Sequence, residues 1–505
     1  VRIDITDDLS LLLGADYSED HQAGNCRHLG NLQNSAAAGL WMTGISDKYL
    51  SDVRNCSGIV KLNQDREIEG YLARLEWDLD WATLTSISAY RSSNFEWIDD
   101  LTGLEPPSVI PTVVETVVDS AEEDASQFSQ EIRLNGNTDH FDWVAGVYYL
   151  REVVERSENF YTEFTPILGL PFPSPGDVTF YQDNKTKSYA AFGQLDWHIT
   201  DALDLSLGLR YSYDEKEIEQ GATDNIGSFP PASGIPLLLP PYGPVEADDD
   251  WDEWTPKVTL SYRFADDVMV YGTAATGFKS GAYASATTTA QDAITPADPE
   301  TATSYEIGLK SQWWDNRIQF NMLGYYIDYE DLQVYFLENF LLNLANAEAE
   351  SQGIELEYVA LLTPHFRVSG SYAYNDTEYT TLVTPNKDLS GNTLARAPEN
   401  SFTITANYDF TLGGGSIIDL EASYFWQDEW YHDPSNAPGT LEDDVGLINA
   451  AITWTSSNDR LSVVAWGKNL DDEEHRVHSI LDASGVTADV YGAPRTYGMT
   501  VNYSF

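Results

Sequence analysis

The sequence of 505 residues contains no run of eighteen or more apolar residues. A transmembrane helix needs about 20 predominantly apolar residues in succession, so this absence excludes helical membrane spans. It does not exclude a transmembrane β-barrel, because a barrel strand turns only alternate side chains toward lipid.

Basic residues are scarce. Lysine and arginine total 27 against 81 aspartates and glutamates, and the formal net charge is −54. So few cations could not neutralise a phosphate backbone, which argues against a nucleic-acid partner. An acidic surface of this kind attracts cations, although it more commonly serves solubility.

Only two cysteines occur, Cys26 and Cys56, and both lie in a polar stretch outside any strand pattern. In an extracytoplasmic loop they favour a disulfide, which would contribute about 3 kcal/mol for a loop of about thirty residues. The alternative is a pair of unrelated thiols. Zinc binding by these two residues is disfavoured, since a structural zinc site takes four ligands.

The first residues, VRID at 1–4, show neither the basic segment nor the apolar segment of a secretory signal peptide. If this chain forms part of an outer-membrane protein, such a signal is required, and we then expect further sequence before Val1.

Aromatic residues are abundant, at 12% with 14 Trp and 30 Tyr, as the interfacial belts of a membrane protein require. In the last eleven residues, apolar and small polar side chains alternate, so a strand here has one apolar face. One such strand fits a soluble sandwich equally well. Outer-membrane barrels, however, end on an apolar, aromatic face of this kind. The apolar positions are Tyr497, Met499, Val501, Tyr503 and Phe505.

The same alternation recurs along the chain, in long strands that short turns join in pairs. Residues 203–213 carry leucine and tyrosine at odd positions and mainly polar residues at even positions. The turn Asn135-Gly136-Asn137 between two such strands is typical of a hairpin. Periodicity alone leaves sandwich arrays, propellers and a wide barrel open.

The lengths of the connections separate these alternatives. Turns such as 135–138 and 456–459 are short, whereas connections such as 159–185 and 220–250 are long. Structureless connections of that length are uncommon in compact domains. Short turns at one end and long loops at the other are typical of outer-membrane barrels.

A count gives one strand at 9–20, eight hairpins and a terminal strand, about 18 strands in all, or about 19 with a short strand at residues 1–4. We therefore predict an all-β, antiparallel transmembrane barrel, with residues 1–505 as one barrel domain. The hairpins are expected at roughly 63–98, 122–156, 185–217, 252–279, 301–330, 350–378, 398–431 and 445–473.

Several stretches resemble the barrel of the TonB-dependent outer-membrane receptors, in the order in which that family carries them. They are FSQEIRLNG at 128–136, TGFKSGAY at 276–283 followed by 296–335, NLANAEAESQGIELEYVA at 343–360, WGKNLDDEEHRVH at 466–478 and GAPRTYGMTVNYSF at 492–505. The resemblance implies a 22-stranded barrel. The family's N-terminal plug, its TonB box and its first strands have no counterpart here.

In a 22-stranded barrel, residues 9–20 would form the fifth strand. We then expect the barrel to be incomplete at its N-terminal side. Between the strand at 9–20 and the terminal strand there should be a gap about four strands, or roughly 19 Å, wide.

The resemblance implies a receptor in the outer membrane of a Gram-negative bacterium, taking up a ferric siderophore or another scarce nutrient with energy from TonB. The implied partners are outer-membrane lipid, the barrel assembly machinery, a small-molecule ligand and, through the plug and box, the TonB complex. No cofactor is implied; the ligand would be a ferric siderophore or heme. The alternative is a passive porin, usually of 16 to 18 strands, or a surface ligand-binding barrel. An enzyme is disfavoured because no nucleophile–base arrangement is present.

Planar ligands stack on aromatic faces, so aromatic residues of the long loops and upper lumen are the candidates for ligand binding. Interfacial anchoring is the alternative for each of them. The candidates are Phe160, Tyr161, Phe164, Tyr242, Tyr283, Phe336, Phe340 and Trp430. Tyr503 and Phe505 are expected to act as the signal for barrel assembly.

Metal sites are disfavoured. His475 and His478 are three residues apart, which places them on opposite faces of a strand. The acidic residues between 248 and 253 fit a solvated acidic loop better than a calcium site, because no glycine-turned ligand spacing is present.

Overall fold

The computed structural model describes residues 1–30, 52–54, 60–101, 115–164, 176–226, 240–287, 289–338, 341–481 and 487–505. Most of these residues lie in β-strands. The helical segments among them, such as α3 (Ala290–Ala293) and the 3-10 turn η2 (Pro438–Thr440), are short. No helix within these ranges is long and apolar enough to cross a bilayer.

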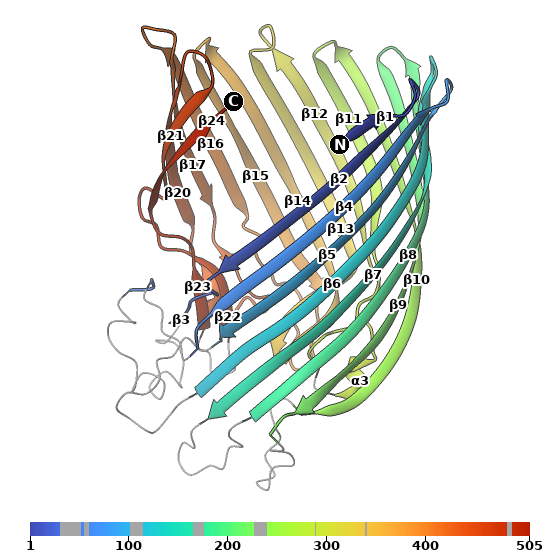
Figure 1. The fold of residues 1–505 in the computed structure, drawn as a ribbon, viewed down its shortest axis with the longest axis vertical. Helices are drawn as coiled ribbons and strands as arrows, with labels where there is room; N and C mark the ends of the chain where they lie inside the picture. Colours follow the sequence, from blue (N-terminus) through green and yellow to red (C-terminus); the bar gives the residue numbers. More distant parts are fainter. Residues whose placement is uncertain are drawn as a thin grey trace.

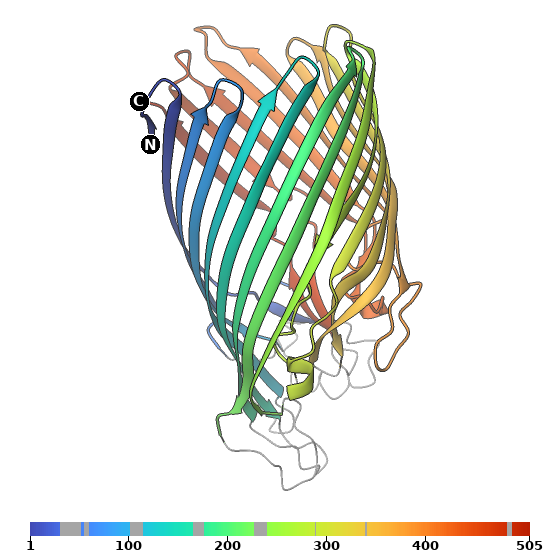
Figure 2. The ribbon, with the colours of Figure 1, turned by 90° about the vertical axis from the view of Figure 1, so that its right-hand side faces the viewer.

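Nineteen strands form one antiparallel sheet, in which each strand pairs with the strands before and after it (Figures 1 and 2). They are β1 (Arg2–Asp4), β2 (Leu9–Gln22), β4 (Asn63–Asp78), β5 (Thr83–Asp100), β6 (Glu115–Asn137), β7 (Phe141–Phe164), β8 (Gly176–Thr200), β9 (Leu203–Asp224), β10 (Tyr242–Ala265), β11 (Val268–Lys279), β12 (Glu300–Trp313), β13 (Ile318–Glu338), β14 (Leu341–Thr363), β15 (Phe366–Thr381), β16 (Asn400–Thr411), β17 (Ile417–Gln427), β20 (Val445–Thr455), β21 (Leu461–Lys468) and β24 (Thr496–Tyr503).

The remaining strands form two smaller sheets. β18 (Trp430–Tyr431) pairs with β19 (Leu441–Glu442), and β23 (Thr487–Tyr491) lies between β22 (Arg476–Leu481) and β3 (Arg27–Gly30). β3 follows β2 near the start of the chain, whereas β22 and β23 precede its last strand. The three-stranded sheet therefore joins segments from opposite ends of the chain.

All eight predicted hairpins are confirmed. The strands are longer than predicted in hairpins such as β6–β7 and β8–β9, and slightly shorter in β16–β17 and β20–β21. The expected long connections 159–185 and 220–250 are shorter than predicted, because β7, β8, β9 and β10 continue into them. The expectation of an acidic loop at 248–253 was wrong, since these residues lie within β10. Strand alternation divides their carboxylates between the two faces of the sheet, which removes a clustered calcium site.

Both chain ends lie at the end of the sheet that carries the short turns, hereafter the short-turn end (Figures 1 and 2). Several of these turns need left-handed backbone, which few residues adopt without strain. Asp80 has φ 68°, Asp459 has φ 57°, and Gly414 and Gly415 have φ 106° and 85°. The opposite end, with the longer connections, is called the long-loop end.

The outward face of the sheet carries an apolar band between two rows of aromatic rings. Tyr149, Tyr189 and Tyr213 neighbour one another across β7, β8 and β9, with ring centroids 5.2 and 6.4 Å apart. Nearer the short turns, Phe141 and Trp197 stack at 6.0 Å. Tyr189 and Trp197 are eight residues apart on β8, about 27 Å along the strand, which in a strand tilted by roughly 35–45° covers about 19–22 Å of an apolar band roughly 25 Å tall.

β24 shows the same outward face at the end of the chain. Tyr497, Met499, Val501 and Tyr503 are 70, 71, 58 and 55% exposed, and the ring of Phe505 lies edge-on to that of Tyr503 at 5.1 Å. The predicted apolar face of the terminal strand is therefore turned outward, as a lipid-facing strand requires.

The other face of the sheet surrounds the lumen and is polar. On β9 the inward positions are even-numbered, as two hydrogen bonds from β9 to the inner segment 280–297 show: Lys216 Nζ donates to the Gly281 carbonyl at 2.6 Å, and the Gln220 amide donates to the Ala293 carbonyl. Charged side chains that point into the lumen form ion pairs, such as that of Arg133 with Glu131 at 3.1 Å.

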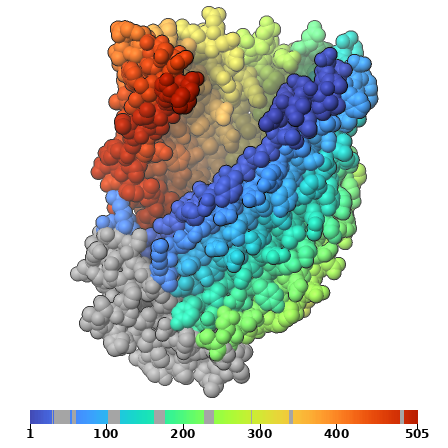
Figure 3. All heavy atoms as spheres, viewed as in Figure 1, coloured from blue at the N-terminus to red at the C-terminus, as the bar shows by residue number. Residues whose placement is uncertain are grey.

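Within the described ranges, β1 pairs only with β2, and β24 pairs only with β21. The sheet is thus open between these edges, as the gap between the dark blue and red segments shows (Figures 1 and 3). Nineteen strands exceed the usual 16 to 18 of a porin barrel. The expected separation of β2 from the terminal strand is confirmed.

Cys26 follows β2, while Cys56 lies outside the described residues. The disulfide between them stays a prediction.

Candidate functional site: the lumen wall at the long-loop end

Strand register aligns inward side chains into rows near the long-loop end of the lumen. Arg66 of β4 lies opposite Phe95 of β5, Phe95 lies opposite Glu123 of β6, and Glu123 lies opposite Arg156 of β7. These positions alternate with the outward, acidic ones, so register alone brings the basic and aromatic side chains together on the inner wall.

Two arginines in these rows stack on aromatic rings. The Arg66 guanidinium lies 4.5 Å from the centroid of Phe95, and the Arg156 guanidinium lies 4.8 Å from that of Trp97. The Phe95 and Trp97 rings are 4.9 Å apart. Arg, Phe, Trp and Arg thus form a continuous layer on the wall, hereafter the Arg–aromatic layer (Arg66, Phe95, Trp97 and Arg156), held by cation–π attraction.

The two arginines differ in their partners. Arg156 is fixed by Glu123 at 3.1 Å and by Glu158 at 2.8 Å. Arg66 is exposed and makes no ion pair with any residue in the described ranges. In a chain with three times as many acids as bases, an exposed arginine on an aromatic ring offers an unused cation and a flat surface to a ligand that is anionic and planar.

Beside the Arg–aromatic layer, the lumen wall is covered by the chain's own inner segment. Val178, Phe180 and Ala222 form a buried apolar cluster with Phe160 and Tyr242 against it. The Phe160 and Phe180 rings meet edge to face at 5.9 Å. The Tyr242 and Thr287 hydroxyls lie 3.1 Å apart, which ties the inner segment 280–297 to β10.

The far side of the inner segment is fixed by hydrogen bonds from β13. The Gln333 amide nitrogen donates to the carbonyls of Ser280 and Asp298, each at 3.0 Å. Together with the bonds from Lys216 and Gln220 on β9, these hold the segment at both of its ends. The inner segment is therefore part of the wall, and its one aromatic residue, Tyr283, is buried.

The predicted ligand-binding residues fall into four groups. Phe160 and Tyr242 pack in the apolar cluster, and Tyr283, Phe336 and Trp430 are buried, at 6, 7 and 8% exposure. Burial raises the pKa of Tyr283, which lies in the inner segment, to about 12. Tyr161 lies on the opposite face of β7 from Phe160. The side chain of Phe164 and all of Phe340 lie outside the described residues.

None of the residues predicted from the sequence as ligand-binding belongs to the Arg–aromatic layer. The available signal was the alternation of β5, which places Phe95 and Trp97 on the polar, lumen-facing side of the strand. Pairing register, which brings the two arginines to these rings, could not be read from one sequence.

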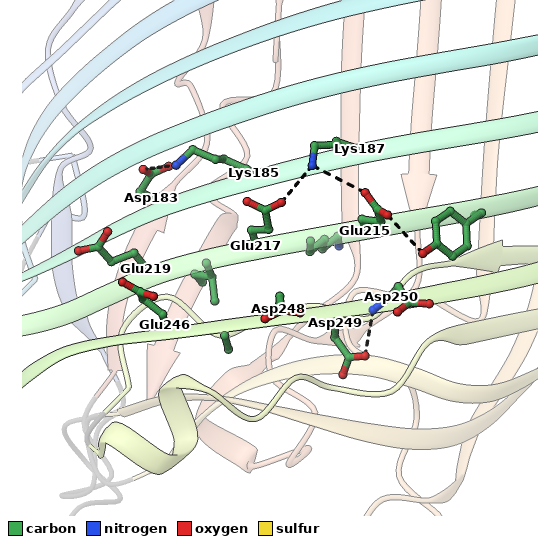
Figure 4. A pocket seen from close by; sticks show the side chains of 14 residues that line it. Asp183, Lys185, Lys187, Glu215, Glu217, Glu219, Glu246, Asp248, Asp249 and Asp250 are labelled. Atoms are coloured by element: carbon green, nitrogen blue, oxygen red, sulfur yellow. Dashed lines mark hydrogen bonds and ion pairs between the residues drawn. The ribbon is translucent and has the colours of Figure 1, made fainter.

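The outward face beyond the aromatic row is strongly acidic. A groove of about 810 Å³ lies over β8, β9 and β10, with Lys185 and Lys187 on β8 and mainly carboxylates on β9 and β10 (Figure 4). Lys185, Glu217 and Asp248 form one cross-strand row. The Lys187 amine lies 3.0 Å from the Glu217 carboxylate. This groove faces away from the lumen. No group of three or more His, Cys, Asp or Glu side chains in the described ranges is placed to hold a metal ion.

Comparisons with known proteins agree with this architecture. Residues 15–470 match the family model described as "TonB dependent receptor-like, beta-barrel". The chain belongs to this family. The TonB-dependent receptors are transport receptors, which favours a role other than catalysis for this TonB-dependent receptor barrel.

Two curated receptors share part of the sequence. The pesticin receptor of Yersinia enterocolitica is 28% identical over 237 residues, which cover 46% of this chain and 31% of the receptor. The metal-pseudopaline receptor CntO of Pseudomonas aeruginosa is 28% identical over 122 residues, or 24% of this chain and 16% of the receptor. The matched part thus spans less than a third of either relative.

Solved structures share the fold over nearly the whole chain. The ferric yersiniabactin uptake receptor FyuA from Yersinia pestis superposes with a TM-score of 0.76 at 18% identity, covering 99% of this chain and 68% of that one. The siderophore receptor PiuA from Acinetobacter baumannii gives a TM-score of 0.72 at 17% identity, with 99 and 73% covered. TonB-dependent receptor barrels are outer-membrane proteins, and the apolar band and aromatic rows described above fit that location.

Proposed function

We propose that this barrel belongs to an outer-membrane receptor of a Gram-negative bacterium, which binds a ferric siderophore at the long-loop end and takes it up with energy from TonB. The Arg–aromatic layer is the observation that carries the proposal. Its free cation at Arg66 and its adjoining rings suit a bulky chelate with aromatic groups and negative charge.

Three further observations support it. The family is one of TonB-dependent receptors, and the superposing structures include receptors described as taking up ferric yersiniabactin and as binding siderophores. The lumen wall is polar, as a path for a hydrophilic complex requires. The inner segment adds a second layer of chain to the lumen wall over β9 and β10, on the strands that follow those of the Arg–aromatic layer.

Binding can be measured on the purified protein in detergent. A panel of ferric catecholate, hydroxamate and phenolate siderophores is titrated while Trp fluorescence is followed, because ligand at the layer should quench Trp97. We expect saturable binding of at least one anionic complex. Arg66→Gln should weaken it about tenfold, the loss of one charge-assisted contact. Arg367→Gln, at the short-turn end of β15, is the matched control and should bind normally.

Energy coupling is tested separately. Cells producing the receptor with its plug and TonB box are given the bound ferric complex labelled with radioactive iron, with and without a functional TonB system. Uptake that depends on TonB supports the proposal. Uptake of equal rate in both strains would instead identify a passive pore, and binding without uptake in either strain a surface binding protein.

A further inference from the structure

The three-stranded sheet at the long-loop end carries a cluster of basic side chains. Its register places Arg27 of β3, Val490 of β23 and His478 of β22 in one row, so Arg27 and His478 lie on the same face. Two strand spacings, about 10 Å, separate their backbones, a distance that an extended arginine side chain largely covers.

Arg27 is buried, at 7% exposure, and uses only one edge of its guanidinium. Its Nε and Nη2 both donate to Asp99 Oδ2, at 3.1 and 2.8 Å. Its Nη1 is fully buried and has no hydrogen-bond partner among the residues that the structure describes. A buried donor without an acceptor is destabilising, so this N–H is a site where an acceptor would be stabilising.

His478 lies close to two positively charged arginines, Arg27 and Arg396. The Arg396 guanidinium donates to His478 Nδ1 at 2.6 Å, and since arginine cannot accept, the imidazole is neutral and carries its proton on Nε2. Burial, followed by the charges of Arg27 and Arg396, lowers the pKa of His478 to about 4. Arg396 is exposed and has no carboxylate partner among the described residues.

His432 adds a second buried group with unused hydrogen-bonding capacity. Its side chain is 1% exposed, and neither ring nitrogen makes a hydrogen bond within the described ranges. Glu442 Oε2 is 3.8 Å from its Nε2, but that oxygen already accepts from Arg476 Nε at 2.5 Å. His432 also lies close enough to His478 to lower the pKa of that imidazole.

The carboxylates around these groups already accept hydrogen bonds. Asp99 pairs with Arg27 through Oδ2 alone, and Glu442 is bound by Arg476 through its side chain and its backbone N–H. Asp489 accepts from Ser479 at 2.6 Å and from Thr487 at 3.2 Å. Among the described residues, no carboxylate lies within hydrogen-bond distance of Arg27 Nη1, the Arg396 guanidinium or the His432 ring nitrogens.

We propose that this cluster binds an oxyanion, the carboxylate or phosphate group of a soluble ligand, at the long-loop end of the protein. An oxyanion accepts several hydrogen bonds at once, and its bonds to arginine are roughly twice as strong as neutral ones. Exposed Arg396 gives it access from solvent, while Arg27 and His432 supply buried donors. An anion here would pair with the exposed Arg396 guanidinium, which now faces a neutral imidazole, and would accept from the remaining N–H of Arg27.

The site lies apart from the Arg–aromatic layer and does not depend on transport. If the proposed receptor function holds, the oxyanion site would favour ligands that carry a free carboxylate or phosphate in addition to their iron-binding groups. If the receptor binds ferric complexes with and without a free carboxylate or phosphate equally well, only the predicted ligand preference is wrong. If the protein is not a receptor for ferric complexes, binding of an oxyanion to the cluster can still be measured.

Calorimetric titration of the detergent-purified protein with inorganic phosphate, and separately with citrate, tests the site. We expect saturable binding of at least one of them at pH 7. Arg396→Gln, which removes an exposed cation, should weaken it about tenfold or more. Arg54→Gln is the matched control, because Arg54 also lies among the long connections but is already paired with Asp472 at 2.9 Å. Absence of binding, or equal losses in both variants, would overturn the proposal.

A second readout does not depend on affinity. In protein labelled at histidine, NMR titration should show that the pKa of His478 rises when phosphate is present, because an anion stabilises the imidazolium. An unchanged pKa at a saturating concentration would refute the site. Repeating the titration in nanodiscs containing phosphatidylglycerol distinguishes the sources. Loss of phosphate binding there would identify a lipid headgroup as the occupant, and unchanged binding would identify a soluble ligand.

Discussion

Single glycines on the sheet make room for tyrosine rings from the neighbouring strand. Tyr325 of β13 lies across Gly353 of β14, and Tyr271 of β11 lies across Gly308 of β12. A Cβ atom at Gly353 would come within 2.7 Å of the Tyr325 hydroxyl oxygen and would overlap the Tyr374 carbonyl oxygen. These pairs cover the exposed backbone of glycine with an aromatic face, which offsets the weakness of glycine in a strand.

We expect Gly353→Ala to destabilise the folded barrel by about 1–3 kcal/mol, the usual cost of overpacking. Gly193→Ala is the control, since its Cβ would lie 3.5 Å from the nearest atom, the Val144 carbonyl oxygen. The measurement is the urea midpoint for loss of the compact form, seen as the heat-modifiable band on a gel. Equal midpoints for the two variants would show that the Tyr325 contact is dispensable.

Acid should weaken the three-stranded sheet through His478. Its pKa is about 4 in the fold and about 6.5 unfolded, so between these values the unfolded state binds more protons. Stability of this sheet is therefore complete above about pH 6.5 and falls as the pH decreases toward 4. Hydrogen exchange of β22 and β23, corrected for intrinsic rates, should accelerate over this range. In His478→Gln, whose amide oxygen also accepts from Arg396, the acceleration should disappear.

At the scale of elements, alternation and turn chemistry predicted nearly every hairpin. Period-two patterns such as residues 203–213 are unambiguous because one face meets lipid and the other meets water. The extent of the strands was not predictable, since beyond the aromatic rows both faces are polar. There the acidic run at 248–253 resembles a loop although it is paired residue by residue with β9.

The residues of the candidate binding site were predictable only in part, because burial and contacts between strands cannot be read from local sequence. Aromatic residues near loops could be named from the sequence, but Tyr283 and Phe336 proved to be buried by contacts distant in the chain. The cation–π contacts of Arg66 and Arg156 depend on Phe95 and Trp97, which lie on another strand. Cross-strand register, rather than local sequence, decides which side chains meet.

The terminal strand should matter for assembly more than for binding. Phe505 is fully exposed and contacts only the outward ring of Tyr503 among the aromatic side chains described, so it contributes little to packing. We expect Phe505→Asp to reduce the amount of folded barrel in the membrane severalfold. Protein that does assemble should bind ligand normally. Ligand binding per folded molecule and the heat-modifiable fraction are measured together; an unchanged folded fraction would contradict an assembly role.

At the scale of the whole molecule, the sheet is continuous from β1 to β24 and open between them. The gap narrows toward the long-loop end, where β3 and β23 pair across it (Figure 1). This pairing joins strand β2 to the hairpin that precedes β24 without any ladder between those two strands. The small sheet therefore fixes the spacing of the two edges at one end only.

Gly30 is the point at which this connection can be broken. It pairs with Thr487, and a Cβ atom there would lie 2.5 Å from the Thr487 hydroxyl oxygen and would overlap the Asp489 carboxylate. We expect Gly30→Val to separate β3 from β23 while the nineteen-stranded sheet remains folded. Gly14→Val on β2 is the control, because its Cβ would make an ordinary contact with Leu72 at 3.6 Å.

Paired cysteines report the separation of the edges directly. Ala465 and Met499 are register partners on β21 and β24, so cysteines at these positions should cross-link readily with a short bifunctional reagent. Cysteines at Leu13 of β2 and Met499 of β24 should not cross-link, because these strands share no ladder and an unbridged gap of several strand spacings, each about 4.8 Å, exceeds the reagent's reach.

In Gly30→Val, a pair at Arg27 and Val490, which are partners in the small sheet, should lose its cross-link while the β21–β24 pair keeps its own. Efficient cross-linking of Leu13→Cys to Met499→Cys would mean that β2 and β24 are neighbours in the membrane. The sheet would then be a closed, smaller barrel, and the expectation of a gap between its two edges would be wrong.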